Sequence, residues 1–496
     1  MKHLFANAPD WLIEKLAHKQ AQPSSDFDEL LKRYGQPFYC PNGDEVSMLN
    51  QTFWAGLYAL EHTGFFDYKE KTFYLYSPDT GLYVEISINT IKQQIAVRIL
   101  EASRELNLPS LEKKRSNHLL DSILAQLKGV MERPNTVAKN HPFIHVANGV
   151  IIFNPDGTTD FTSFSPIYFS KNRSPLVYKP GAKCPRFLKE LLNSAVSPEN
   201  ALLIQKVVGC FLLGNNPIQR ILILDGLPER GKSQLVLVIQ KIIGIENVTE
   251  LRTKHLSERF ELFRYRRKKL LVGVDVPGRF LSEKGAYVLK GLVGGDLFDA
   301  EQKGGTGSFQ IQGNFGIVIV SNSRLQVHLD GDVGAWRRRL LIVRFEAPPP
   351  TRKIPNFADV LIQEEGPGIL NWALEGAQLL LNDIATYGDI RLNETQRNIV
   401  DALLSESDSL RNFLSKCVIK AVDNDLPIYE IVEAYAQFCP QQGWNPKPIT
   451  IIHRELPQLM LELFAVSKSH SVSRNGKDVN GFRGVKLVNP GAMPWH

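Results

Sequence analysis

The sequence predicts an α/β fold, a mostly parallel sheet with helices on both faces, in residues 216–350 of a 496-residue chain. Short runs rich in Ile, Leu and Val predict this sheet, because a strand that is buried on both faces reads as a continuous apolar stretch. Helical stretches separate the runs, as the crossover connections between parallel strands require. The expected strands are Arg220–Leu224, Lys269–Val274, Phe315–Val320 and Leu340–Phe345.

Four further regions surround this α/β region. Residues 1–140 predict a mixed, mostly helical N-terminal domain with a hairpin near 73–86. Residues 141–215 predict a helical connecting module, and residues 351–394 predict a helical segment that follows a linker signal of three prolines. Residues 395–496 predict three helices followed by a glycine-containing β-wing, a pattern typical of a winged-helix domain.

The composition excludes two classes of protein. With 43% hydrophobic and 22% charged residues, the chain resembles packed globular proteins and differs from disordered ones. No apolar run approaches the roughly 20 residues that a membrane-spanning helix needs, so we expect no membrane partner. The five cysteines form no CxxC pair and the N-terminus lacks a long apolar segment, which favours a reducing cytoplasm. The net charge of +6 permits a nucleic-acid partner without requiring one.

The most specific motif lies between the first expected strand and an apolar helix at Leu235–Ile243. Residues Gly226–Ser233 fit the phosphate-loop pattern GxxxxGKS/T at every fixed position. In this pattern backbone N–H groups surround the phosphates at a helix N-terminus, Lys232 contacts the β- and γ-phosphates, and Ser233 ligates Mg²⁺. The alternative is a glycine-bearing loop that matches by chance. The motif predicts a P-loop ATPase core with ATP and Mg²⁺ as cofactors, bound by Gly226, Leu227, Pro228, Glu229, Arg230, Gly231, Lys232, Ser233 and Gln234.

Two polar side chains follow other expected strands. Asp275 comes directly after the strand that ends at Val274, and we expect it to hold Mg²⁺ together with Ser233, because a phosphate loop needs a second metal-holding carboxylate. The alternative is an Asp that forms the Val-Pro-Gly turn. Asn322 follows the strand that ends at Val320, where an amide can orient the attacking water and sense the γ-phosphate. The alternative is an Asn in a Ser-Asn-Ser turn.

A basic run, Trp336–Arg339, precedes the fourth expected strand. A guanidinium that reaches the γ-phosphate of a neighbouring subunit acts as an arginine finger and raises the rate by roughly 10³–10⁵-fold. Arg338 and Arg339 are candidates for this role. The alternative, a solvated basic run in front of a strand, is the one that these residues alone favour.

Taken in order, these residues resemble superfamily III helicases, and more closely the helicase part of phage- and plasmid-type (poxvirus-like) primase-helicases. The matching residues are the phosphate loop, Asp275, Lys290–Asp296, Lys303, Asn322 and the arginine pair Arg338 and Arg339. The flanking segments agree. Within residues 141–215, the pre-helicase module of this family is matched by Asn148–Val150, Cys184–Phe187 and Gly209–Gly214. Glu365–Leu374 is similar to its post-motor helix, and residues 405–490 are similar to its winged helix. The resemblance covers about residues 141–490.

The resemblance implies an AAA+-like ring, expected to be a hexamer, that binds ATP between subunits and translocates on single-stranded DNA. Lys232, Ser233 and Asp275 would act within one subunit, and Asn322 would match the sensor residue. One of the two paired arginines would act on the nucleotide of the neighbouring subunit. Residues 296–312 would form the hairpin that lines the central channel and would contact DNA through its turn, at Lys303, Gly304 and Gly305. The alternative for Lys303 is an exposed lysine on a β-turn.

The chain departs from the family next to Asp275. Many members carry two adjacent acids, or a Glu, at this motif, whereas Val276 follows Asp275 in this chain. The residue that polarises the attacking water is therefore open at this point. The candidates are Glu283 and Asp296, with Glu301 as a weaker one.

We therefore expect an ATP-dependent DNA helicase from the replication machinery of a mobile element such as a phage, plasmid or island. Its expected partners are single-stranded and forked DNA, further copies of the chain, and a separate primase or replication initiator. A primase site is not expected in this chain, because the acid pair at 26–28 fits a helix N-terminus. Two alternatives stay open: an origin-binding initiator that uses ATP as an assembly switch with little unwinding, and an RNA-directed viral helicase.

Overall fold

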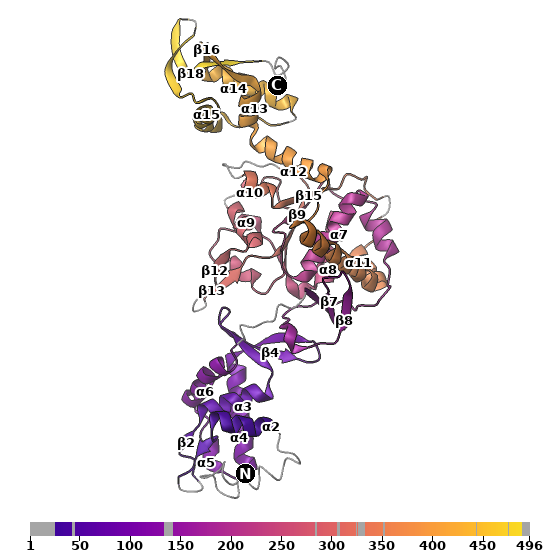
Figure 1. The fold of residues 1–496 in the computed structure, drawn as a ribbon, viewed down its shortest axis with the longest axis vertical. Helices are drawn as coiled ribbons and strands as arrows, with labels where there is room; N and C mark the ends of the chain where they lie inside the picture. The colour runs from indigo at the N-terminus through magenta and orange to yellow at the C-terminus, as the bar shows by residue number, and fades with distance from the viewer. Residues whose placement is uncertain are drawn as a thin grey trace.

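Three units follow one another along the molecule (Figure 1). We name them the N-terminal unit (25–132), the central unit (142–407) and the C-terminal unit (408–488). The computed structural model describes residues 25–41, 45–132, 142–282, 285–304, 308–323, 325, 333–350, 353–442, 444–474 and 476–488. Among these residues, no helix has the length and apolar character needed to cross a membrane.

The N-terminal unit combines helices with a small antiparallel sheet. Its hydrophobic core lies between α3, α4 and α6. The side chains of Asn50, Ser87 and Ser116 start these three helices, because each accepts a backbone N–H of the first turn. The predicted hairpin is present as β4 and β5, and β3 adds a third strand. The elements are α2 (Ser25–Tyr34), β1 (Phe38–Tyr39), β2 (Met48–Leu49), α3 (Gln51–Glu61), β3 (Gly64–Asp67), β4 (Thr72–Ser77), β5 (Leu82–Ile86), α4 (Ile88–Glu105), α5 (Pro109–Glu112) and α6 (Asn117–Val130).

The predicted connecting module contains more strand than expected. It begins with the antiparallel sheet of β6 (Phe143–Val146), β7 (Gly149–Phe153) and β8 (Thr159–Thr162). A 3₁₀ turn, η1 (Pro166–Tyr168), follows, and then a π-helical turn, η2 (Phe187–Leu192), and α7 (Pro198–Leu213). The helical part of this module consists of two separate elements, η2 and α7, because Ser197 caps a new helix whose first residue is Pro198.

The predicted parallel sheet is present in the central unit. Its order is β10-β11-β14-β9-β15, and all four neighbouring pairs are parallel. The fifth strand, β10, was not predicted, because three residues are too few for a periodic pattern. The strands are β9 (Ile221–Asp225), β10 (Val248–Glu250), β11 (Leu270–Gly273), β14 (Gly316–Ser321) and β15 (Leu340–Arg344).

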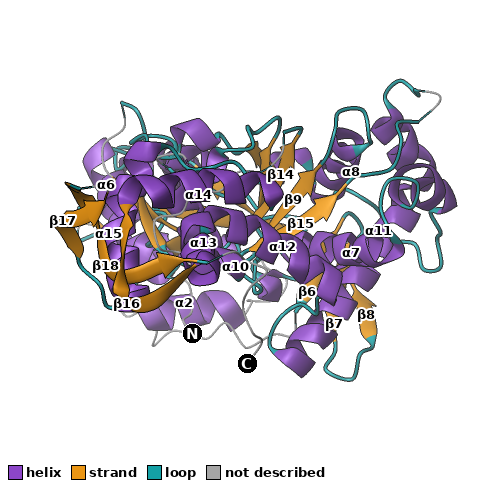
Figure 2. Cartoon of the chain, turned by 90° about the horizontal axis from the view of Figure 1, so that it is seen from above, coloured by secondary structure: helices purple, strands orange, loops and turns teal. Residues whose placement is uncertain are grey.

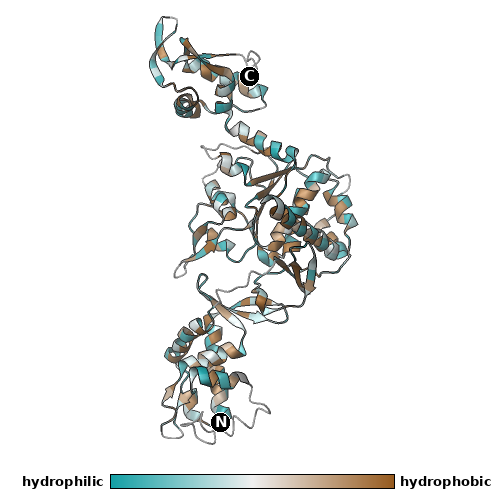
Figure 3. Cartoon of the chain, in the orientation of Figure 1, coloured by the Kyte–Doolittle hydropathy of each residue, from teal (hydrophilic) through white to brown (hydrophobic). Residues whose placement is uncertain are grey.

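Both faces of this sheet are covered, which explains why its strands are apolar throughout. Leu222 and Leu224 pack against α7, α8 and α11, whereas Ile221 and Ile223 pack on the opposite face with α9, α10 and α12. Figure 2 shows α7, α8 and α11 on one side of β9, β14 and β15, with α10 on the other, and Figure 3 shows hydrophobic residues along these strands. The helices are α8 (Lys232–Ile243), α9 (Ala286–Gly294), α10 (Val333–Arg337), α11 (Phe357–Tyr387) and α12 (Glu394–Ser407).

Glycines allow the closest helix contact of the central unit. A Cβ added to Gly209 of α7 would lie 2.1 Å from the Ala377 nitrogen of α11, and one added to Gly376 would lie 2.0 Å from the Gln205 oxygen. The two backbones therefore meet directly. On the other face, α12 packs Val400 and Leu404 into the core of the sheet. The domain boundary expected at residue 395 thus falls inside a helix that belongs to the central unit.

The C-terminal unit contains three helices and a three-stranded antiparallel sheet around its own core. The glycine-containing segment near the C-terminus forms an antiparallel hairpin of β17 and β18. The sheet also includes β16, whose polar sequence reads as a loop. The elements are α13 (Ser409–Cys417), β16 (Val418–Pro427), α14 (Ile428–Gln441), α15 (Ile449–Phe464), β17 (Lys468–Arg474) and β18 (Lys477–Leu487).

Candidate functional site

The predicted phosphate loop connects β9 to α8 at the carboxyl edge of the sheet. Gly226 and Gly231 both have positive φ angles, +143° and +86°. These conformations are open to glycine and strained for other residues. A Cβ on Gly226 would also lie 2.6 Å from the Phe345 oxygen. The loop leads directly into the N-terminus of α8. The first backbone N–H groups of a helix have no partner within the helix, so this end of α8 favours anions.

Lys232, the first residue of α8, folds back over this loop. Its side chain donates to the backbone oxygens of Gly226 and Leu227, both at 2.6 Å, and the residue is only 3% exposed. Burial lowers the pKa of Lys232, and Asp225 and Asp275 oppose that shift. The ammonium therefore lies inside the curve of the loop and close to two carboxylates at the same edge. Ser233, the next residue, is exposed.

The segment after β15 holds the loop from its outer side. Arg230 donates to the backbone oxygens of Glu346 and, at 2.7 Å, Ala347. Glu229 pairs with Lys353 at 2.6 Å. The side-chain oxygen of Gln234 accepts the N–H of Ala358 at 3.1 Å, which links α8 to the start of α11. These contacts could not be predicted from local sequence patterns, because they join residues more than 100 positions apart.

Asp275 and Asn322 meet at the same edge as the loop. The Asn322 amide donates to the Asp275 carboxylate at 2.7 Å. Asp275 follows β11 and Asn322 follows β14, and β14 lies between β11 and β9 in the sheet. The backbone of Asp275 has φ +50°, a turn conformation that Asp tolerates better than most residues. The structure thus brings together the loop, Asp275 and Asn322, as the strand ends predicted.

These residues form a chemically suitable set for Mg²⁺. Sites for this ion commonly combine one or two carboxylates with substrate phosphates and water. Asp275 supplies a carboxylate and Ser233 a hydroxyl at the edge where a phosphate would bind. Within the described ranges, no group of three or more His, Cys, Asp or Glu side chains could hold a metal by itself.

The candidate arginines lie at the opposite edge of the sheet. Leu340, the first residue of β15, pairs with Ile221, the first residue of β9, so Arg338 and Arg339 come before the amino edge. Five strand residues, roughly 16 Å, separate this edge from the loop of the same chain. The structure therefore does not bring either arginine to the phosphate loop of its own subunit.

The two arginines differ in their surroundings. Arg339 is 8% exposed and donates to the backbone oxygens of Ala335 at 3.0 Å and Lys290 at 3.3 Å. Arg338 is exposed, and within the described part of the chain its side chain makes no hydrogen bond or ion pair. Arg337 pairs with Asp401 of α12 at 2.7 Å.

The expected hairpin is formed by β12 (Leu297–Glu301) and β13 (Ser308–Gln312), two antiparallel strands. Lys303 is exposed in the turn, and Gly304 has φ +75°. Gly305 lies outside the described residues. The hairpin leaves the amino edge of the sheet, because its second strand leads directly into β14.

The geometry corrects the expectation about the residue that polarises water. Asp296 and Glu301 belong to the hairpin at the amino edge, and Glu301 pairs with Arg259 at 2.6 Å. Neither can act at the loop of its own chain. Glu283 lies outside the described residues. A carboxylate that sequence reasoning missed is Asp225, which ends β9 and acts on the charge of Lys232. Asp225 stands at the end of an apolar strand, as Asp275 does, and this position in the sequence could have identified it as a candidate.

Part of the central unit is similar to a known protein family. Residues 224–339 match a family of unknown function (DUF5906). This stretch runs from the end of β9 to Arg339 and includes the loop, Asp275, Asn322 and the hairpin. The family's description assigns no activity, so a function has to come from the residues of the site.

A search of solved structures finds similarity to the NrS-1 C-terminal region. One apo structure aligns at a TM-score of 0.48 with 13% identity, over 87% of this chain and 98% of the other. Two A-form apo structures align at TM-scores of 0.46 and 0.44, with 15% and 14% identity, over 88% and 87% of this chain and 99% and 98% of theirs. Among curated proteins, no match to the chain is found.

Proposed function

We propose that the chain is an ATP-dependent DNA helicase of mobile-element replication, a ring-forming motor that moves along single-stranded DNA. The observation that carries this proposal is the separation of charged groups between the two edges of the central sheet. Lys232, Asp275 and Asn322 gather at the carboxyl edge, and Arg338 lies exposed at the amino edge. A site built from both sets needs two subunits.

At the carboxyl edge, each side chain has a defined task. The N–H groups of the loop and of the first turn of α8 bind the phosphates, and Lys232 exchanges its two carbonyl partners for phosphate oxygens. Asp275 and Ser233 would hold Mg²⁺, which supplies positive charge to the β- and γ-phosphate oxygens when bound. Asn322 already has its amide beside Asp275 and can orient the water that attacks the γ-phosphate.

Arg338 would complete the site of the neighbouring subunit. The same surface would then be used head to tail around a closed ring, for which a hexamer is expected. We assign the finger to Arg338 rather than Arg339, because the guanidinium of Arg339 is buried and already donates to two backbone oxygens of its own subunit.

The DNA path would follow the β12–β13 hairpin. Its tip carries the exposed Lys303, and copies around a ring would form a ring of positive charge suited to a single-stranded backbone. The C-terminal unit, which we interpret as a winged helix, would bind forked or duplex DNA or a partner such as a primase or initiator.

A second candidate function has one observation in its favour. The residue after Asp275 is Val276, which is buried, and the Asp275 carboxylate accepts a hydrogen bond from Asn322. Without an adjacent carboxylate, hydrolysis would be slow. A chain of this kind fits an origin-binding initiator that uses ATP as an assembly switch and unwinds little.

Strand displacement on a forked DNA duplex tests the main proposal. Wild-type protein should unwind the fork with ATP, and Lys232→Ala should not. Lys241→Ala is the matched control, because Lys241 lies on the same helix and pairs with Asp359 away from the loop. Hydrolysis of ATP without unwinding by the wild type would favour the switch instead.

A further inference from the structure

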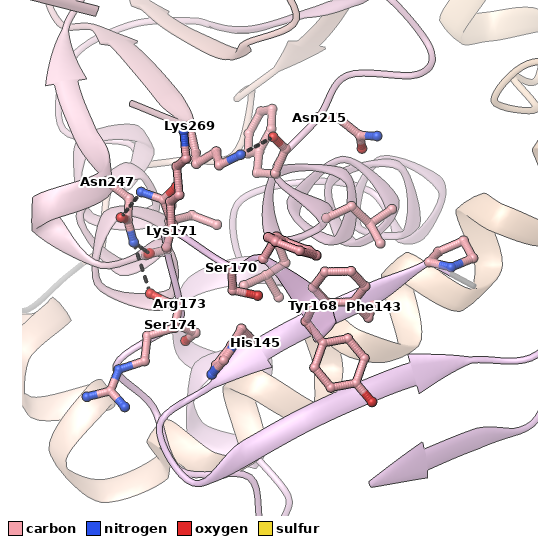
Figure 4. A pocket seen from close by; sticks show the side chains of 18 of the residues that line it. Phe143, His145, Tyr168, Ser170, Lys171, Arg173, Ser174, Asn215, Asn247 and Lys269 are labelled. Carbon is pink, nitrogen blue, oxygen red and sulfur yellow. Dashed lines mark hydrogen bonds between the residues drawn. The ribbon is translucent and has the colours of Figure 1, made fainter. Parts of the chain in front are cut away.

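A pocket of about 810 Å³ opens at the amino edge of the central sheet, on the side away from the phosphate loop. One wall comes from β6 and the segment 168–174, and the other from the end of α7 and the residues that precede β10 and β11. Its volume lies in the range of roughly 300–1,000 Å³ that is usual for small-molecule sites. Figure 4 shows Lys269 and Asn247 on one side, Phe143 and Tyr168 on the other, and Ser170 between them.

The charged lining of this pocket favours an anion. Two carboxylates, Asp67 and Glu70, contact the pocket, and both pair with Lys171, at 3.1 and 2.6 Å. Lys269 donates to the Gly214 oxygen at 3.0 Å, which uses one of the three N–H donors of its ammonium. Burial and the nearby charge of Lys171 both lower the pKa of Lys269. The cationic side chains exceed the two carboxylates by three: Lys171, Arg173, Arg267, Lys268 and Lys269.

One buried polar side chain in the lining lacks a partner. Ser170 is 8% exposed, and its hydroxyl makes no hydrogen bond to any residue that the structure describes. His145, which is 4% exposed, also lines the pocket and has the backbone of Thr80 as a polar neighbour. Buried polar atoms are almost always satisfied in native proteins, so the Ser170 hydroxyl is available to a water or a ligand in the pocket.

His145 is neutral at physiological pH. Burial, together with the charge of Arg173, lowers its pKa to about 4, although the backbone of Thr80 opposes the shift. A neutral imidazole offers one donor and one acceptor. It can therefore bond to the edge of a heterocycle or to a sugar hydroxyl.

Aromatic rings line the same pocket. The rings of Phe143 and Tyr168 lie 5.1 Å apart, and Phe169 and Phe211 also contribute to the lining. Aromatic side chains beside cationic ones form the usual combination for binding a base and its phosphate.

We infer that this pocket binds a nucleoside phosphate, with the phosphate toward Lys171, Lys269 and Ser170 and the base against Phe143 and Tyr168. The same chemistry has two sources, a free mononucleotide and the phosphorylated end of a single DNA strand. The inference is independent of ATP hydrolysis, because the pocket and the phosphate loop lie at opposite edges of the sheet. A bound phosphate would compete with Asp67 and Glu70 for Lys171, and would so weaken the contact between the N-terminal and central units.

Titration calorimetry on the full-length Lys232→Ala protein tests this inference, because that variant lacks the loop lysine. The probes are AMP and a 5′-phosphorylated ten-residue oligothymidylate. We expect at least one probe to bind and to slow hydrogen exchange in residues 165–174. Adding Ser170→Ala should weaken that binding about tenfold, since one phosphate hydrogen bond is lost. Ser194→Ala is the matched control, because Ser194 is an exposed serine outside the pocket.

Each outcome has a defined meaning. Binding of AMP identifies a free nucleotide as the ligand. Binding of the oligonucleotide alone identifies a strand end when it protects residues 165–174 and is weakened by Ser170→Ala, because binding at the β12–β13 hairpin would do neither. The inference is overturned if neither probe binds at millimolar concentration. Exchange protection confined to residues 226–234, or binding that Ser170→Ala does not alter, also overturns it. None of these results bears on the unwinding test with wild-type protein, so the two proposals can fail separately.

Discussion

The two edges of the central sheet differ in how their polar side chains are used. At the carboxyl edge, the side chains of Lys232 and Asp275 make their hydrogen bonds, among the described residues, to loop carbonyls and one amide, which a phosphate and a metal can replace. At the amino edge, several charged residues pair with each other: Arg267 contacts Glu70 and Glu85, and Arg259 contacts Glu301. The difference indicates that the polar groups of the carboxyl edge can change partners when a ligand binds, whereas ion pairs at the amino edge also join the N-terminal and central units beside the pocket.

The largest expected effect is on ATP turnover, and it distinguishes Arg338 from Arg339 at the amino edge. Arg338→Ala should lower ATP turnover by roughly 10³–10⁵-fold, the usual worth of an arginine finger, and should leave stability nearly unchanged because the side chain is exposed. Turnover of DNA-stimulated ATPase and thermal unfolding measure the two quantities.

Arg339→Ala is the control for that experiment. It should lower the free energy of unfolding by about 1–3 kcal/mol, since it leaves the oxygens of Lys290 and Ala335 without their donor. Mixing Arg338→Ala with Lys232→Ala subunits should partly restore turnover, because some interfaces then combine an intact loop with an intact finger. Absence of any rescue would argue against a shared site.

The next effect concerns the carboxyl edge. Lys232→Ala should reduce turnover by roughly 10²–10³-fold, as expected for loss of one donor that stabilises charge in the transition state. Lys241→Ala, on the same helix, should stay close to wild type. Steady-state ATPase assays measure both, and unchanged turnover in Lys232→Ala would remove the phosphate-loop assignment.

A smaller effect tests the ion pairs between the units. Burial alone would raise the pKa of Glu70, but Lys171 and Arg267 lower it to about 2 from 4.5. A carboxylate with a depressed native pKa stabilises the fold above its unfolded value, and this stabilisation is lost as pH falls from about 4.5 toward 2. Glu70→Gln should therefore flatten the loss of thermal stability between pH 5 and 3.

The matched variant for this test is Glu112→Gln. Glu112 pairs with Arg115 on the exposed surface of the same unit, where an ion pair contributes little. Its stability profile against pH should follow that of the wild type. If the stability profile of Glu70→Gln against pH also matched that of the wild type, the ion pairs between the units would not contribute to stability.

The smallest expected effect concerns the hairpin. Lys303→Ala should reduce the slope of log affinity against log salt for single-stranded DNA by about 0.7, the value for one lost phosphate contact. Lys189→Ala is a suitable control, because this exposed lysine lies in η2, which packs with α8 and α11 on the other face of the sheet. A slope that stays the same in Lys303→Ala would place the DNA path elsewhere.

The sequence by itself determined the local elements of the central unit. Four of the five strands lie within two residues of their predicted bounds, because a strand buried on both faces must be apolar at every position. It also determined that Asp275 and Asn322 lie at the edge of the phosphate loop, since parallel strands end on the same side. Its misses were short or polar strands, β10 and β16, which carry no periodic apolar signal.

Only the tertiary structure decided what depends on strand order and on distant partners. It placed Asp296 and Glu301 at the wrong edge to polarise water at their own loop, and it distinguished the buried Arg339 from the exposed Arg338. It also assembled the pocket around Ser170 from segments about 100 residues apart. The physical reason is that burial and hydrogen-bond partners are set by packing between distant segments, which no local pattern of residues encodes.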